Sequence, residues 1–448
     1  MKKTALCLAL LGLLALGGQA FAVICTIDEV PAATLLLPYF EVDLGNANGE
    51  NTLFSINNAS ATAVLAHVVV WSDLSKVVLD FNVYLTGYDV QTISLRDIIV
   101  NGRLPVTASA GQDPKDTISP KGDFSQDINF ASCSGQLPLG ALPANYTAHL
   151  QQALTGHQSQ LFNNLCFGLN HGDNIARGYI TVDTVSLCTL QNPGDPGYFG
   201  AGGSGFATNQ NVLWGDYFYV NSAENFADGN PLVHIEASGT NPETSTPGQY
   251  TFYGRYDNPG PWTAIDNREP LSTNFAVRFL NGGDFSGGTD LRVWRDSKTN
   301  LPNGFTCAAT GPTAGNLAAA NAAPWYPLGQ EGIVIFDEEE QPNLIPGVPV
   351  SPPPPTQTNV PFPAETQSVH VGSGALPVPF DFGWLYLNLN TTVSVQNGIG
   401  SPPEDPAAAQ AWVTARMTAS GRFSVGFDAI QLDSACTAVH FCPGGCGL

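Results

Sequence analysis

The sequence predicts an all-β protein with two tandem antiparallel β-sandwich domains and few helices. Segments 81–95 and 178–187 alternate apolar and polar residues and are rich in Val, Ile, Tyr and Thr, which is the period of half-buried strands. The 47 Gly and 34 Pro leave few stretches long enough for helices. Segment 51–73 recurs with substitutions at 274–296, which indicates an internal duplication.

The N-terminus is typical of a secretory signal peptide over residues 1–22. Lys2 and Lys3 form a charged start, 5–16 is an apolar core, and 20–22 reads Ala-Phe-Ala, a cleavage-site pattern. No later run approaches about 18 uncharged apolar residues, so no membrane insertion is expected. The sequence therefore predicts an exported protein that is periplasmic, at the cell surface or extracellular. The Met-Lys-Lys start is typical of bacteria.

The first copy of the duplication is expected to span residues 23–190. Within it, 61–71 is a continuous apolar run, suited to a central strand with both faces covered. The best helix candidate is 144–162, interrupted by Gly156. A Gly/Pro-rich connector at 191–205 follows this copy.

The second copy is expected to span 206–448, with an insertion at 222–273 and a Pro-rich exposed loop at 348–363. Three further pairs of blocks match in the same order, namely 34–43 with 212–221, 177–187 with 422–432 and, more faintly, 84–89 with 326–331. All are expected to form equivalent strands.

Matched residues in the two copies are expected to have the same structural roles. Trp71 and Trp294 should pack between sheets, while Asp73 and Asp296 should cap the turns that follow. Arg177 and Asp183 in the first copy match Arg422 and Asp428 in the second. These residues are interpreted as strand-face or turn contacts rather than as a duplicated active site.

Segments 57–71 and 81–85, which read NNASATAVLAHVVVW and FNVYL, resemble Ig-like β-sandwich modules of bacterial exported surface proteins. The resemblance covers about 60 residues and implies a sandwich fold. It implies no activity.

The charge of the chain limits its partners and cofactors. Lys and Arg number 16 against 38 Asp and Glu, for a formal net charge of −22, which disfavours nucleic acid and anionic lipid. We expect no cofactor, and we expect Asp337, Glu338 and Glu339 after the apolar run 332–336 to form a solvated turn. The alternative is a Ca²⁺ site with these three acids as its ligands.

Eight cysteines follow the predicted cleavage site, an even number that favours disulfides in an exported protein. Cys166–Cys188 and Cys442–Cys446 are the pairs we expect. A zinc site in the tail, with His440 as a ligand, is the alternative. The eight are Cys25, Cys133, Cys166, Cys188, Cys307, Cys436, Cys442 and Cys446.

The chain contains neither a G-x-S-x-G nucleophile motif nor an H-E-x-x-H zinc motif. This favours a non-catalytic binding or surface-structural protein, with a polysaccharide or a cell-surface protein as partner. The alternative is a glycosidase-like secreted hydrolase with carboxylates in the groove between the two sandwich domains, because that chemistry needs only two acids.

The insertion at 222–273 combines strand-like segments with aromatic and charged residues. Its aromatics either cover an added hairpin or form a recognition surface whose rings stack on sugars or apolar groups. Strand alternation would place Tyr253 and Arg255 on a ligand face and Phe252 in the core. The candidate ligand-binding residues are Tyr253, Arg255, Trp262, Glu236 and Arg268.

Overall fold

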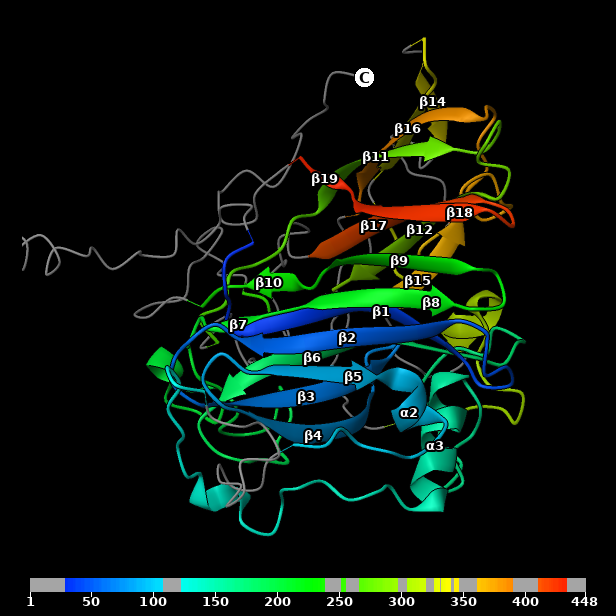
Figure 1. Cartoon of the computed structure of the whole chain (residues 1–448). Helices are drawn as coiled ribbons and strands as arrows, with labels where there is room; N and C mark the ends of the chain where they lie inside the picture. The colour runs from blue at the N-terminus through cyan, green and yellow to red at the C-terminus, as the bar shows by residue number, and fades with distance from the viewer. Residues whose placement is uncertain are drawn as a thin grey trace, which may run out of the picture.

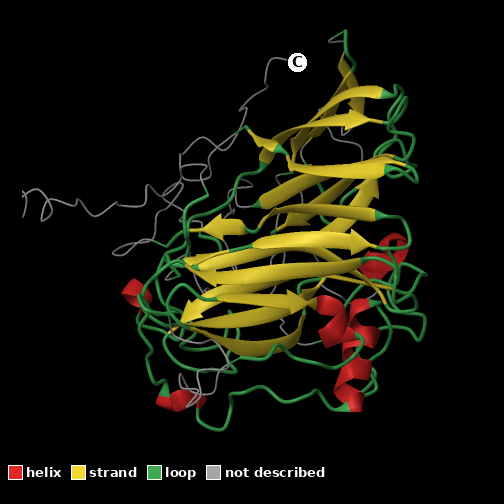
Figure 2. Cartoon of the chain, in the orientation of Figure 1, coloured by secondary structure: helices red, strands yellow, loops and turns green. Residues whose placement is uncertain are grey.

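A computed structural model shows that the fold is all-β, with four antiparallel sheets and two short α-helices in the part of the chain that it describes (Figure 2). No helix in that part is long and apolar enough to cross a membrane. The described residues are 29–107, 122–237, 251–254, 266–296, 304–319, 326–330, 332–339, 342–345, 361–389 and 410–432.

The first sandwich consists of two facing sheets. One has the order β10 (Val233–Ile235), β1 (Thr34–Asp43), β6 (Ile175–Val185), β3 (Val64–Ser72) and β4 (Val77–Leu85). The other has the order β5 (Val90–Ser94), β2 (Asn51–Asn58), β8 (Asp216–Asn221) and β9 (Phe226–Pro231), and β7 (Leu213–Trp214) also pairs with β2. Apolar residues from both sheets form one core between them.

Two helices, α2 (Leu95–Ile99) and α3 (Ala144–Leu154), lie at one end of this sandwich (Figure 1). The predicted helix at 144–162 is confirmed over its first part, because α3 ends at Leu154. Gly156, just past this end, has φ +71°, and a residue with positive φ often follows a helix. The 3₁₀ turns are η1 (Ala131–Cys133), η2 (Ala201–Gly203) and η3 (Ala314–Ala319).

The second sandwich also has two facing sheets around a core of its own. One has the order β14 (Pro342–Ile345), β13 (Gly332–Phe336), β16 (Phe382–Asn388), β11 (Asn274–Leu280) and β19 (Ile430–Gln431). The other has the order β15 (Thr366–His370), β12 (Gly288–Arg295), β17 (Ala411–Ala419) and β18 (Phe423–Asp428).

The sheet pairings correct the predicted start of the second copy. β8 pairs with β2, and β10 pairs with β1. Residues 213–235 therefore complete both sheets of the first sandwich, although the sequence placed them in the second copy.

The pairings agree with the repeat for 51–73 and 274–296 but not for the other blocks. β2 and β3 lie in facing sheets, as do β11 and β12, and β3 and β12 each lie between two antiparallel neighbours. However, 34–43 forms β1 and 212–221 includes β8, which lie in different sheets of one sandwich. In the first sandwich, β6 pairs with β3. The corresponding neighbour of β12 in the second sandwich is β17, whereas the block 422–432 contains β18. Residues 326–330 form no strand to match β4.

Trp71 and Trp294 do occupy matching strands, but their packing differs from the expectation. Both lie on the outer face of their sheet and join one aromatic cluster between the two sandwiches. Trp71 stacks on Tyr179 at 5.7 Å between ring centroids, and Tyr179 meets Trp294 edge-on at 6.1 Å. Phe252 stacks on Trp294 at 5.5 Å.

The expected turn-capping role of Asp73 is wrong. Its carboxylate accepts from the Leu169 backbone N–H at 2.9 Å and pairs with His171 Nε2 at 3.0 Å. The Oγ of Ser72 caps the turn instead, by accepting from backbone N–H groups within it. The turn after Asp296 lies outside the described residues.

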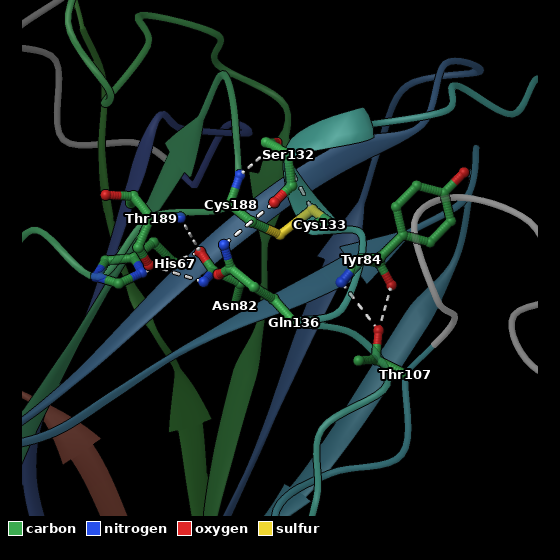
Figure 3. Close-up of a disulfide and its surroundings, with 9 residues drawn as sticks. All are labelled: His67, Asn82, Tyr84, Thr107, Ser132, Cys133, Gln136, Cys188 and Thr189. Atoms are coloured by element: carbon green, nitrogen blue, oxygen red, sulfur yellow. Dashed lines mark hydrogen bonds between the residues drawn. A yellow bond between two sulfur atoms is a disulfide. The ribbon is translucent and has the colours of Figure 1, made fainter.

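The predicted Cys166–Cys188 bond is also wrong. The bonds are Cys133–Cys188 and Cys166–Cys307 (Figure 3 shows the first). The 11-residue strand β6 lies between Cys166 and Cys188, and a strand of that length separates its ends by about 33 Å. The other four cysteines, including the Cys442–Cys446 pair and the zinc alternative with His440, lie outside the described residues.

Candidate functional site

Three of the five candidate ligand-binding residues, Tyr253, Glu236 and Arg268, are at most 1% exposed. Segment 251–254 forms a turn rather than the expected strand, so alternation does not set the direction of its side chains. Phe252 is in the core, as predicted, but Tyr253 joins the same buried cluster and offers no open ring face. Arg255 and Trp262 lie outside the described residues.

Tyr253 and Arg268 converge on the buried carboxylate of Asp183. The Tyr253 and Tyr198 hydroxyls donate to Asp183 Oδ2 at 2.9 and 2.7 Å, and Thr34 donates to Oδ1. Arg268 Nε lies 3.5 Å from Oδ1 and donates to Thr34 Oγ1. This buried network agrees with the interpretation of the insertion as packing, because a buried carboxylate needs such donors.

Glu236 serves the same packing. Its backbone N–H donates to Glu269 Oε1 at 3.2 Å, and the Glu269 N–H donates to the Glu236 carbonyl at 2.9 Å. These two bonds join Glu236 to Glu269, so the two ends of segment 237–268 lie side by side.

The candidate calcium ligands lie on an exposed turn after β13. Asp337 Oδ1 accepts from the Glu339 N–H at 2.9 Å, which closes the turn. Glu338 makes a surface ion pair with Arg278 at 3.7 Å. Among the described residues, no three His, Cys, Asp or Glu side chains are arranged to hold a metal.

A polar pocket of about 270 Å³ lies where the two sandwiches meet. We call it the interdomain groove. The first sandwich contributes the end of the β1–β2 loop and the β8–β9 turn, and the second contributes the end of the β11–β12 loop, β12, β17, the β17–β18 turn and the start of β18. Its lining is Glu50, Asn221, Glu224, Phe226, Gly287, Asp290, Arg416, Thr418, Ala419, Ser420, Gly421, Arg422 and Phe423.

The outer face of β12 runs from this groove into the interface. Asp290, Arg292 and Trp294 alternate on that face, while Leu291 and Val293 point into the core. Asp290 is at the groove, Arg292 is 2% exposed, and Trp294 is in the aromatic cluster. One strand thus passes from an open polar site to a buried cation and then to a buried ring.

A row of charged groups crosses the sheet at Asp290. Its cross-strand neighbours are His370 on β15 and Arg416 on β17. His370 Nδ1 lies 2.9 Å from Asp290 Oδ1, and Arg416 Nη2 lies 3.3 Å from Oδ2. The Arg416 guanidinium also reaches across to the first sandwich, where Nη1 lies 3.3 Å from Glu50 Oε1. Arg416 therefore bridges two carboxylates of different domains.

Local contacts hold Glu50 and Arg416 in these positions. Asn221 Nδ2 donates to Glu50 Oε2 at 3.3 Å, and Arg96 Nη2 donates to the Glu50 carbonyl at 2.8 Å. The Arg416 guanidinium lies 5.2 Å from the centre of the Phe226 ring, a cation–π contact that orients it.

Arg292 forms the buried support of the groove. It lies 3.5 Å from the centre of the Tyr219 ring, and its guanidinium is 3.7 Å from Glu50 Oε1 and 3.6 Å from Asp228 Oδ2. Burial acts to lower the pKa of Arg292, but Tyr219 and the surrounding carboxylates raise it above its ordinary value. The guanidinium thus remains charged between the domains.

Burial has the opposite effect on the carboxylates. Burial and the nearby Glu41 raise the pKa of Glu50, against the lowering effect of Arg416 and Arg292. Burial likewise raises the pKa of Asp228 more than the same two arginines lower it. Both acids therefore take up a proton more readily than an exposed carboxylate.

An exposed ring forms one rim of the groove. Phe423 is 49% exposed and meets Phe285 edge-on at 5.9 Å. It follows a tight turn in which Gly421 has φ +70° and the Arg422 N–H donates to the Ala419 carbonyl at 2.9 Å. This conformation favours glycine.

Neither a family model, nor a curated protein, nor a solved structure matches this chain.

Sequence reasoning did not find the groove residues. The alternation of Asp290, Arg292 and Trp294 was visible as a signal, because two charges and a ring on one strand face suit neither a core nor plain solvent. Their partners Glu50 and Arg416 lie far away in sequence, and only the packing of the two sandwiches brings them together.

Proposed function

We propose that this chain is an exported, non-catalytic binding protein whose ligand site is the interdomain groove. The observation that carries the proposal is Arg416, which bridges Glu50 and Asp290 beside an exposed ring, Phe423, in a pocket between domains. Ligand sites often lie at domain interfaces and combine a few fixed polar groups with apolar surface. A polysaccharide or a cell-surface protein is the partner.

Export is supported by the signal-like N-terminus and by the two disulfides in the described part of the chain, because disulfides persist in oxidising compartments. The resemblance of 57–71 and 81–85 to Ig-like modules of bacterial surface proteins supports the same placement. The acidic chain disfavours nucleic acid and anionic membranes as partners.

A secreted hydrolase is the second candidate, because Glu50 and Asp290 both face the groove and Glu50 has a raised pKa. Glycosidases need one protonated and one ionised carboxyl group. Against this, Glu50 is engaged by Arg416 and Asn221, while Asp290 is engaged by Arg416 and His370. Such engagement suits fixed acceptors better than groups that transfer protons.

Binding and product release on an array of polysaccharides and peptides test the proposal. We expect Asp290→Asn to weaken binding about tenfold or more, because a hydrogen bond to a charged group is worth about 1.5–3 kcal/mol. The control is Asp337→Asn, on the turn after β13 away from the groove lining, which should bind as the unmodified protein does.

Three results would contradict the proposal. Binding that Asp290→Asn leaves unchanged would place the site elsewhere. Absence of binding to every member of the array would contradict the proposed binding function. Release of shorter sugars by the unmodified protein, lost in Glu50→Gln, would favour the hydrolase.

A further inference from the structure

We infer that the interdomain groove takes a neutral hexopyranose unit of a polysaccharide, with Phe423 as its stacking ring and the bridged Glu50–Arg416–Asp290 set as its hydroxyl-binding groups. This inference rests on the proposed binding function and names its ligand class.

The charges of the lining favour a neutral ligand. Glu50, Glu224 and Asp290 face Arg416 and Arg422, and the whole chain has a net charge of −22. A polyanion would be repelled by this field. A cation would have to compete with Arg416, which already lies 3.3 Å from both Glu50 and Asp290.

Hydroxyl groups suit this arrangement because each one can both donate and accept. A carboxylate oxygen accepts, and the neighbouring guanidinium N–H donates. Two adjacent hydroxyls of one sugar ring can therefore bind the same carboxylate–arginine pair at once. Thr418, Ser420 and Asn221 add further neutral partners along the wall.

The apolar side of a pyranose ring needs a flat ring to cover it, and Phe423 offers one. Half of its surface is open, and the edge-on contact with Phe285 limits its movement. The pocket volume of about 270 Å³ is just below the range of about 300–1,000 Å³ for small-molecule sites. It therefore suits one sugar unit, with the rest of the polymer outside.

One wall of the groove depends on a close approach of the Gly287 backbone to the side chains of Ser420 and Thr418. A side chain at Gly287 would come within 2.9 Å of Ser420 Oγ and of a Thr418 methyl carbon. Glycine at this position lets the β11–β12 loop and the β17–β18 turn meet, and so closes one side of the groove.

Titration calorimetry of the oxidised protein tests the inference with defined probes. These are neutral oligosaccharides from cellulose, β-1,3-glucan and mannan, the anionic polymers alginate and hyaluronan, and cationic chitosan oligomers. We expect at least one neutral probe to bind, and Phe423→Ala to weaken that binding about tenfold. Phe423→Tyr should retain it.

The matched control is Val425→Ala. Val425 is 45% exposed and lies two residues further along β18, but it does not line the groove. It should bind as the unmodified protein does. Equal losses for Phe423→Ala and Val425→Ala, or none for either, would overturn the stacking role.

The outcomes also separate this inference from the function on which it rests. Groove-dependent binding confined to anionic or cationic probes, or to peptides, would overturn the neutral sugar and leave the binding function intact. Absence of groove-dependent binding to any sugar or peptide would overturn both.

Discussion

At the residue scale, burial separates the candidate residues into those that can meet a ligand and those that cannot. The sequence made Tyr253 and Arg268 candidate ligand-binding residues, but the structure buries both and brings them together at Asp183. Their depth in the fold could not be predicted, because it depends on how 251–254 turns between the sandwiches. Phe423 and Arg416 could not be singled out from the sequence, because exposed aromatic and charged residues are common on any protein surface.

Asp80 on β4 gives a pH-dependent prediction. Burial, with Asp195 nearby, raises its pKa to about 7. The folded protein therefore keeps a proton that the unfolded chain loses near pH 4, so this group stabilises the fold at low pH and ceases to do so as pH rises through about 7. The unfolding free energy should fall as pH rises from about 4 to about 7, by on the order of 4 kcal/mol from this group, because one pKa unit corresponds to about 1.4 kcal/mol.

Urea unfolding of Asp80→Asn between pH 4 and 8 measures the effect. Asparagine keeps the shape without a titrating proton, so the variant should show a flatter pH profile and should be more stable than the unmodified protein at pH 8. Asp284→Asn is the control, because Asp284 has an 81% exposed side chain. Identical pH profiles for Asp80→Asn and the unmodified protein would show that Asp80 does not hold the proton.

At the element scale, local patterns identified strands well, but pairing was beyond them. The apolar run at 61–71 became β3, and the matched pair 51–73 and 274–296 became strands of matching topology. Short identities such as those between 34–43 and 212–221 instead reflect two different sheets with similar strand composition. Pairing is set by contacts between distant segments, which a single sequence does not report.

The disulfide Cys133–Cys188 supports an element that has little regular structure. Residues 122–143 contain only a 3₁₀ turn and isolated bridges, and the bond ties them to the chain beyond β6 (Figure 3). A cross-link over 55 residues stabilises a fold by about 4 kcal/mol in the chain-entropy model. Cys133→Ser/Cys188→Ser should therefore lower the unfolding free energy by up to this amount.

Limited proteolysis provides a second measurement on the same variant. We expect cleavage within 122–143 to accelerate, while the β2 and β3 core peptides remain protected, because loops cleave where they open locally. Uniform cleavage across the first sandwich, or a stability equal to that of the unmodified protein, would contradict a local role for the bond.

At the scale of the whole molecule, the two sandwiches share buried contacts. β12, β15 and β18 of the second contact β1, β6 and β9 of the first (Figure 1), and Cys166–Cys307 joins the chain beyond α3 to the segment 304–319. Arg292 lies in this interface at 2% exposure, with Glu50 and Asp228 from the first sandwich around it. We therefore expect a single cooperative unfolding transition in the calorimeter.

Replacing Arg292 tests this cooperativity. Arg292→Met removes the cation but leaves Glu50 and Asp228 buried without it, and breaking such a buried set costs about 3–5 kcal/mol. The lost stabilisation comes from contacts between the two sandwiches. The melting profile should therefore broaden or split into two transitions, with a lower first midpoint. Arg422→Met, at an exposed pair with Asp284, should leave the single transition within about 0.5 kcal/mol of the unmodified protein. A single unshifted transition in Arg292→Met would show that Arg292 does not couple the sandwiches, and that the aromatic cluster, the other strand contacts and Cys166–Cys307 suffice.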